Sequence, residues 1–189
     1  AGHEVHVVTM GYKGLLDYEE KEGIHIHRVR CLRKRKEMST MPEMATYLWP
    51  AYKKAKELHK KKPIDINHTH FLIPTGIVSM RLKKKLGIPY IITTHGSDVP
   101  GFNTDRFRIM HKFTKPLLGR IIRQAKSVVS PSYYLETLIK KNISKDIKIH
   151  VIPNGINLQE FKPAKKEKII LATGRVLPRK GFQHIISAV

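Results

Sequence analysis

The sequence alternates between short apolar segments rich in β-branched residues and longer segments whose apolar residues recur at helical spacing. The first kind predicts strands at 5–9, 24–29, 64–69, 90–94, 127–130, 147–152 and 168–173. The second kind predicts helices at 44–58, 76–86 and 104–124, a helix opening at 131–132, and another over 181–189. Strands spaced by helices in this rhythm favour an α/β fold with a parallel sheet covered on both faces.

Prolines and a charged stretch refine this organisation. Pro50 is expected to kink or split the helix over 44–58, and Pro116 to break the helix over 104–124. The segment 161–167 is charged, contains a proline and has little to bury, so it is the best candidate for a linker.

Composition excludes several classes of protein. A single cysteine, Cys31, excludes an internal disulfide framework and a cysteine-based zinc cluster. No apolar run approaches the roughly 18–20 residues of a membrane span. The net charge of +21 implies attraction to an anionic partner: nucleic acid, a phosphorylated small molecule or an anionic membrane surface. A thermophile-like composition, or an acidic partner domain outside this chain, would equally explain the charge.

Polar residues that follow the predicted strands are the first candidates for a site, because parallel sheets bind ligands at the carboxyl ends of their strands. His68 and His70 have the i, i+2 spacing of two metal ligands on one strand, but no third ligand is evident. His95-Gly96 follows the strand at 90–94, where glycine lets a ligand approach closely, although an ordinary polar turn fits too. Ser130 and Ser132 suit helix capping or anion binding.

Two further loops follow predicted strands, and in so basic a chain the cations of the second also fit an ordinary solvated loop. Asn154-Gly155 follows the strand at 147–152 and is a turn signal that fits either a generic turn or a crossing between domains. Arg175 and Lys180 flank a loop between a predicted strand and a helix N-terminus, and two cations in that position suit a diphosphate.

Taken together, these motifs resemble those of a retaining glycosyltransferase of family 4, the glycogen synthase-like and phosphatidylinositol mannosyltransferase-like family with the GT-B architecture. The motifs that carry the resemblance are Gly2-His3-Glu4-Val5-His6-Val7-Val8-Thr9, Leu86-Gly87-Ile88-Pro89, Thr94-His95-Gly96, Val129-Ser130-Pro131-Ser132, Val151-Ile152-Pro153-Asn154-Gly155-Ile156-Asn157, Phe161-Lys162-Pro163, Thr173-Gly174-Arg175 and Lys180-Gly181. The resemblance implies two Rossmann-like domains: residues 1–161 as the N-terminal, acceptor-side domain, and 162–189 as a linker with the first strand and helix of a donor-binding domain.

The family also implies roles for individual residues. Arg175 and Lys180 correspond to the pair that neutralises the donor diphosphate, and His95 to the cleft histidine beside the transferred sugar, with Gly96 next to it. Asn154 and Gly155 correspond to the interdomain crossing, where Gly155 provides the turn. Ser130 and Ser132 correspond to cleft-facing positions at a strand end and helix start. The resemblance implies no metal and no cofactor; the donor is a substrate, a UDP-, GDP- or ADP-sugar.

Two parts of the family pattern are absent from these residues. The family's first strand, with its Gly-rich loop, would precede residue 1, and most of the donor domain would follow residue 189. We therefore expect the chain to come from a larger open reading frame and to be inactive by itself. Without the first strand, its neighbours would expose backbone groups and apolar surface. Asp98 is the nearest carboxylate to a nucleophile position, and we do not expect it to act as one.

The basic residues fall into two clusters, 28–36 and 53–62, and the second adjoins Trp49. Cations beside aromatic residues suit a peripheral position on an anionic membrane, and many members of the family use lipid-linked acceptors. The expected location is the cytoplasm, either free or at the inner face of the membrane. Two other interpretations remain open: a nucleic-acid-binding protein, supported by charge alone, and a non-catalytic scaffold with a glycosyltransferase-like fold.

Overall fold

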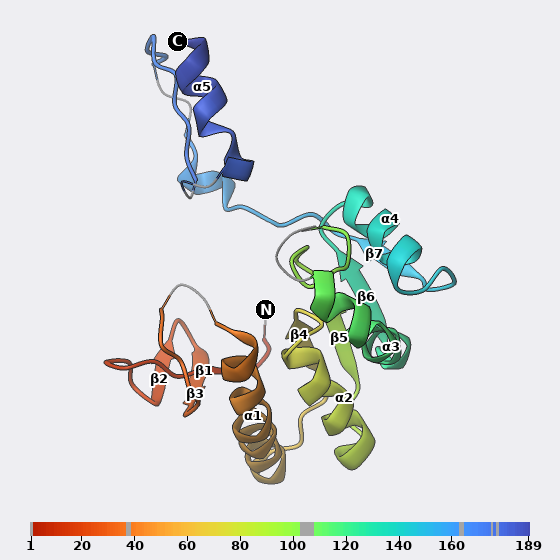
Figure 1. Ribbon diagram of the computed structural model, residues 1–189. Coiled ribbons are helices and arrows are strands. Elements are labelled where there is room, and N and C mark those ends of the chain that lie inside the picture. The colour runs from red at the N-terminus through yellow and green to blue at the C-terminus, as the bar shows by residue number, and fades with distance from the viewer. Residues whose placement is uncertain (1, 37–38, 103–107, 163–164, 175, 177) are drawn as a thin grey trace. The chain divides into compact units, whose positions relative to one another are not determined.

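The computed structural model describes residues 2–36, 39–102, 108–162, 165–174, 176 and 178–189. The chain divides into two compact units, residues 1–154 and 155–189, which are described separately below. The first unit contains all the described strands and four of the five described α-helices (Figure 1). None of the described helices combines the length and the apolar character needed to cross a membrane.

A parallel four-stranded sheet occupies the later part of the first unit. Its strands are β4 (Asn67–His70), β5 (Tyr90–Thr93), β6 (Ser127–Ser130) and β7 (Ile149–Val151), hydrogen-bonded in that order. The predicted α/β class and parallel sheet are therefore confirmed. The outer strands are shorter than the predicted segments 64–69 and 147–152.

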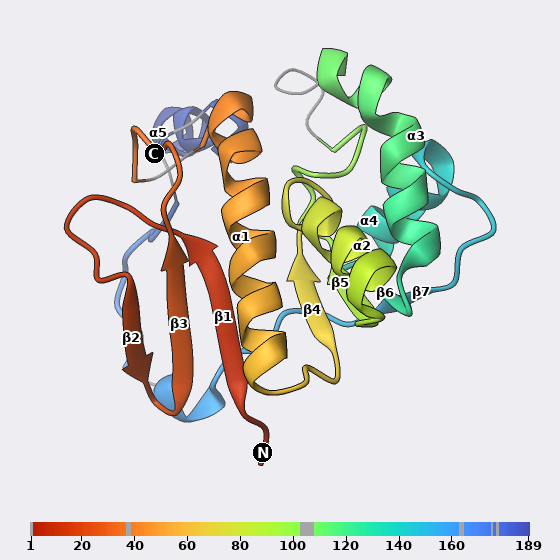
Figure 2. The same cartoon turned by 90° about the horizontal axis from the view of Figure 1, so that it is seen from below.

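A second, mixed sheet contains the first three strands in the order β1-β3-β2 (Figure 2). Strand β1 (Val5–Met10) runs parallel to β3 (Ile24–Val29), as the sequence indicates, whereas β2 (Tyr18–Lys21) is antiparallel to β3 and was not predicted. Glu22 and Gly23 join the hairpin with φ of 53° and 75°, the two positive values of a type I′ turn. Among the described residues, β1 and β4 each have one strand neighbour.

Helices pack on these sheets and form two hydrophobic cores. Helix α1 (Met41–Lys61) and helix α2 (Thr75–Leu86) enclose one core with the three-stranded sheet, to which Tyr47, Ala51 and Leu82 belong. Helix α3 (Arg108–Gln124) and helix α4 (Tyr133–Asn142) enclose the other core with the four-stranded sheet, around the fully buried Tyr90 and Ile92.

The prolines within helices do not interrupt them. Helix α1 continues through Pro50 and α3 through Pro116, so the expectation that these prolines split or break the helices is wrong. In α1, buried Tyr47 and Ala51 lie on either side of Pro50, and Ala55 is buried one turn later. Packing on both sides of the proline outweighs the one backbone hydrogen bond that proline cannot donate.

The second unit, residues 155–189, contains the 3₁₀ turns Leu158–Glu160 and Pro178–Lys180 and the helix α5 (Phe182–Ala188). The helix predicted at 181–189 is confirmed, but the strand predicted at 168–173 is wrong. Ile170 and Leu171 are 71% and 82% exposed. Among the described residues of this unit no other strand pairs with the segment, and a lone strand leaves its backbone groups without ladder partners.

Candidate active site

The carboxyl ends of β4, β5 and β6 bring three predicted site segments to the same edge of the four-stranded sheet. His70 is the last residue of β4, His95 follows β5 by two residues, and Ser130 ends β6. The register aligns His70 with Thr93 and Thr93 with Val129. The three segments therefore lie at the strand ends, the edge at which parallel sheets bind ligands.

A row of histidines extends along this edge. His70 Nδ1 lies 2.9 Å from His95 Nε2, so one ring donates a hydrogen bond to the other. The His68 ring stacks on His70 with centroids 4.6 Å apart, and His68 Nε2 lies 2.8 Å from the hydroxyl of Thr93. The Phe71 ring packs against His95 at 4.6 Å. His95 is therefore held between a hydrogen-bonding ring and an apolar ring.

Burial lowers the pKa of His95, and the neighbouring His70 lowers it further, although the carboxylate of Asp98 opposes this shift. Burial likewise lowers the pKa of His68, with added repulsion from His70 and His95. At neutral pH both rings are therefore uncharged, and each can donate one hydrogen bond and accept another. A neutral His95 suits hydrogen bonds with uncharged polar groups better than formation of an ion pair.

Asp98 is buried and binds two separate loops. Its Oδ1 accepts a hydrogen bond of 3.0 Å from the His95 backbone N–H, and its Oδ2 accepts one of 2.9 Å from the Leu72 N–H. Burial raises the pKa of this carboxyl group, while the backbone donors act in the opposite direction. Both oxygens are engaged, so Asp98 is placed to hold the backbone rather than to attack a substrate.

Gly96 is required by both conformation and space. Its φ of 95° lies in the left-handed region, and a Cβ there would come within 2.7 Å of the Phe102 ring. Its carbonyl accepts a hydrogen bond of 2.8 Å from the Val99 N–H, which closes the turn that returns the chain to Asp98. The polar turn that the sequence allowed at Gly96 is therefore present.

The two predicted serines make local contacts. The fully buried Ser130 donates a hydrogen bond of 2.9 Å to the Ser132 carbonyl, and the Ser132 hydroxyl accepts one of 3.2 Å from the Leu135 N–H at the start of α4. Ser132 is thus the N-cap of α4, which is the capping alternative that the sequence left open.

The remaining predicted residues lie around and beyond the division between the units. Asn154 and Gly155 are exposed on either side of this division. Gly155 has no left-handed φ, and a Cβ there would meet no atom within 4 Å, so its conformation does not require glycine. Lys180 is exposed at the end of a 3₁₀ turn, immediately before Gly181, the N-cap of α5. Arg175 lies outside the described residues.

Sequence reasoning located His95 and missed its partners. The His68-Thr69-His70 pattern was considered as a metal site without a third ligand, whereas the structure places His95 against His70. Within the described part of the chain, these three histidines do not form a group of converging metal ligands. The position of His70 at the end of a predicted strand could have indicated the contact, but only the strand register establishes it.

Comparisons with known proteins agree with this architecture. The sequence profile of the family described as Glycosyltransferase Family 4 matches residues 1–160. An uncharacterized glycosyltransferase of Methanocaldococcus jannaschii is 31% identical over 189 residues, covering 98% of this chain and 48% of that protein. An Escherichia coli UDP-Gal:alpha-D-GlcNAc-diphosphoundecaprenol alpha-1,3-galactosyltransferase is 28% identical, covering 70% of this chain and 37% of that protein.

The fold is similar to that of sucrose-phosphate synthase from Thermosynechococcus elongatus, with a TM-score of 0.67 and 20% identity over 86% of this chain and 41% of the synthase. This similarity supports the predicted GT-B-type α/β architecture. The chain spans about half the length of the first curated relatives that it matches.

Proposed function

Because the chain belongs to glycosyltransferase family 4, we propose that the protein of which it is part transfers a sugar from a nucleotide-sugar donor to a hydroxyl group of an acceptor. The observation that carries the proposal is the placement of His95. It lies beyond β5 with a neutral ring bonded to His70 and a backbone fixed by Asp98. A rigidly held neutral imidazole at a strand end is suited to orienting sugar hydroxyls.

In the proposed reaction the bond between the sugar C1 and the diphosphate breaks, and a bond from C1 to the acceptor oxygen forms. The nucleoside diphosphate departs with the electron pair of the broken bond, and one of its oxygens accepts the proton that the acceptor hydroxyl loses. Arg175 and Lys180 are proposed to stabilise the charge that develops on the diphosphate, which requires no metal. Retention of the anomeric configuration is part of this proposal, as for the family that the sequence resembles.

The proposed roles divide the residues into two experimental groups. Lys180 and Arg175 act on the donor diphosphate, so their loss weakens donor binding as well as catalysis. His95 acts on the sugar and not on the nucleotide, so its loss lowers kcat more than it weakens nucleotide binding. A residue that only maintained the fold would affect both to the same degree.

The test is calorimetric titration of the intact gene product with UDP-, GDP- and ADP-sugars. We expect saturable one-to-one binding of one donor, weakened at least about tenfold by Lys180→Ala or Arg175→Ala and unchanged by Lys168→Ala, an exposed lysine of the same unit. Each ten-fold loss corresponds to about 1.4 kcal/mol. His95→Ala is expected to bind the nucleotide and lose turnover.

The outcome that contradicts the proposal is the absence of sugar-nucleotide binding. Titration with tRNA is the parallel control for the net charge of +21. Salt-sensitive binding to tRNA without any donor binding would favour the nucleic-acid alternative, since counterion release makes such binding fall steeply with salt. Binding to neither ligand would favour the non-catalytic scaffold.

We further propose that the protein uses a lipid-linked acceptor at an anionic membrane surface. One face of α1 carries Trp49, Lys53, Lys56 and Lys60, spaced at i, i+4, i+7 and i+11. Trp49 is 59% exposed, and the Arg81 guanidinium lies 5.3 Å from its ring centroid. An aromatic side chain flanked by cations suits the headgroup region of a membrane. The E. coli relative is named for a diphosphoundecaprenol-linked substrate.

Trp49 is the single tryptophan of the chain, so its fluorescence reports on this face directly. We expect a blue shift and co-sedimentation with vesicles that contain phosphatidylglycerol, but not with pure phosphatidylcholine vesicles. Replacing Lys53, Lys56 and Lys60 by Gln is expected to abolish binding, whereas the same change at Lys83, Lys84 and Lys85 at the end of α2 leaves it intact. Equal losses in both triple variants would indicate attraction by overall charge alone.

A further inference from the structure

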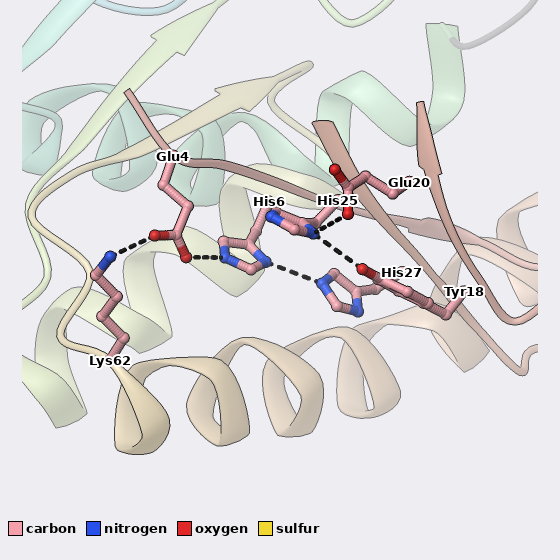
Figure 3. Close-up of polar contacts among 7 residues, drawn as sticks. All are labelled: Glu4, His6, Tyr18, Glu20, His25, His27 and Lys62. Atoms are coloured by element: carbon pink, nitrogen blue, oxygen red, sulfur yellow. Dashed lines mark hydrogen bonds and ion pairs between the residues drawn. The ribbon is translucent and has the colours of Figure 1, made fainter. Parts of the chain in front are cut away.

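We propose that Glu4, His6 and His25 bind a divalent transition-metal ion of the zinc type, at a site separate from the His95 region. His6 lies on β1, Glu4 directly precedes β1, and His25 lies on β3 of the same three-stranded sheet (Figure 3). Glu4 and His6 fall in one motif of the family resemblance, but the resemblance gives them no role, and the donor chemistry proposed above does not use this cluster.

The backbone places the ligands on one face. Side chains two residues apart on a strand point the same way, so Glu4 and His6 share a face, and His25 and His27 share a face. The parallel register pairs His6 with His25 directly. Their rings stack with centroids 4.6 Å apart. Two hydrogen-bonded strands therefore position the two histidines, and Glu4 directly precedes β1.

The donor atoms already converge. One donor atom from each of Glu4, His6 and His25 lies within 4.8 Å of the other two. Glu4 Oε1 and His6 Nε2 are 2.8 Å apart. Ligand atoms around a tetrahedral zinc ion lie about 3.3 Å apart, given bond lengths near 2.0–2.1 Å. Small side-chain rotations would close the set around an ion, with water as the fourth ligand.

Neighbouring side chains orient two of the ligands. His6 Nδ1 lies 3.0 Å from His27 Nε2, and the Tyr18 hydroxyl lies 2.9 Å from His25 Nδ1. The Glu4 carboxylate only accepts hydrogen bonds, so His6 carries its proton on Nε2 in the ion-free state. An ion bound at Nε2 would shift this proton to Nδ1, where His27 Nε2 is positioned to accept a hydrogen bond. A metal-bound histidine commonly donates its second N–H to such a partner.

The charges at the site are compatible with a cation. Lys62 bonds to Glu4 Oε2, whereas the contact with His6 uses Oε1, so the lysine and the ion need not compete for the same oxygen. Lys54 lies near His27, and the Glu20 carboxylate lies 3.7 Å from His25 Nδ1. The side chains of His6, His25 and Glu4 are 28%, 27% and 42% exposed, so water and an ion can reach them.

The ligand atoms favour transition-metal ions over Mg²⁺ and Ca²⁺. Two imidazoles and one carboxylate suit Zn²⁺, Co²⁺, Ni²⁺ or Cu²⁺, whereas Mg²⁺ and Ca²⁺ prefer an all-oxygen set. A bound ion would link β1 to β3. Binding to the native state alone would raise the stability of this sheet.

The test uses the intact gene product, expressed without a histidine tag and stripped of metal with a chelator. Calorimetric titration with ZnCl₂ is expected to show one saturable site that MgCl₂ does not fill. His6→Ala and His25→Ala should each weaken binding at least tenfold, and His150→Ala, at an exposed histidine on β7, should leave it unchanged. Glu4→Gln preserves the shape of a surface side chain and should weaken binding even if a histidine variant unfolds.

A second readout identifies the ligands. Co²⁺ bound by two imidazoles and a carboxylate in tetrahedral geometry should give visible absorption that disappears in Glu4→Gln and His25→Ala. Zinc affinity that is unchanged in all three site variants would overturn the proposal. A site that survives these changes but is lost in His68→Ala or His70→Ala would assign the metal to the His95 region instead.

Discussion

At the residue scale, Asp98 and Gly96 determine the path of the backbone that carries His95. Asp98 accepts hydrogen bonds from the backbone N–H groups of His95 and Leu72. Gly96, with its left-handed φ, makes the turn between His95 and Asp98. The position of His95 therefore depends on Gly96 and on Asp98, which has no expected contact with a substrate.

Gly96→Ala should destabilise the protein by about 2–4 kcal/mol. The left-handed φ accounts for about 1–2 kcal/mol, and displacement of the Phe102 ring accounts for the rest. Gly87 is the matched control, because it has a φ of 73° and an added Cβ would meet no atom within 4 Å, so Gly87→Ala should cost only about 1 kcal/mol. Urea denaturation of both variants measures the difference; equal losses would mean that Phe102 does not restrict this turn.

His95 itself was predictable because it follows an apolar strand in a parallel α/β pattern, and that position depends on local sequence. Its contact with His70 was not predictable, because it depends on the register that aligns His70 with Thr93. The role of Asp98 was missed for the same reason: Leu72 lies 26 residues away in the chain. Arg175, Lys180 and the serines remain predictions as substrate contacts.

At the scale of elements, α1 begins with a local hydrogen-bond network. Glu43 Oε2 accepts hydrogen bonds from the Thr40 N–H at 2.6 Å and from the Thr40 hydroxyl at 2.8 Å, and Oε1 accepts one of 2.7 Å from the Lys34 N–H. These donors lower the pKa of Glu43, the backbone N–H of Thr40 most of all. The network joins the start of α1 to the chain that leaves β3.

Glu43→Gln should lower the melting temperature at pH 7 and should have less effect at pH 3. Because the folded pKa lies below the unfolded value, the carboxylate stabilises the fold fully above about pH 4.5, and this contribution is lost as the pH falls through the folded pKa. Thermal melts of both proteins between pH 3 and pH 7 test this expectation. Glu167→Gln, at an exposed position, is the control. A pH-independent difference would assign the effect to shape rather than charge.

Elements were predictable where a local pattern suffices. The strands at 90–94 and 127–130 and the helix at 76–86 agree with β5, β6 and α2. The hairpin strand β2 was missed because its four residues carry little apolar pattern. The segment 168–173 has the composition of a strand but no partner among the described residues of its unit, so composition alone misled the prediction.

At the scale of the whole molecule, buried side chains are distributed unevenly. Both hydrophobic cores lie within residues 1–154, and no described residue of 155–189 is buried. The free energy of local opening increases with the number of buried contacts, so the first unit should resist proteolysis better than the second.

Trypsin should cleave the 189-residue chain first at the exposed Lys165, Lys166 or Lys168 and leave a resistant product that contains the first unit. Mass spectrometry of a time course identifies the order of cleavage. A variant with Gln at these three positions should delay the first cleavage. Initial cleavage within α1, at Lys53 or Lys60, would show that the first unit opens more readily than its packing indicates.

The double engagement of Asp98 also sets a rule for exchanging loops between related enzymes. The segment after β4 and the segment after β5 are both hydrogen-bonded to the Asp98 carboxylate, so they form one structural unit. A chimera whose 71–76 segment follows a different backbone path, without the matching 95–98 segment, would separate the N–H of residue 72 from the Asp98 carboxylate and leave both unmatched. Transfer of any binding property carried by either segment would therefore require both segments to be moved together.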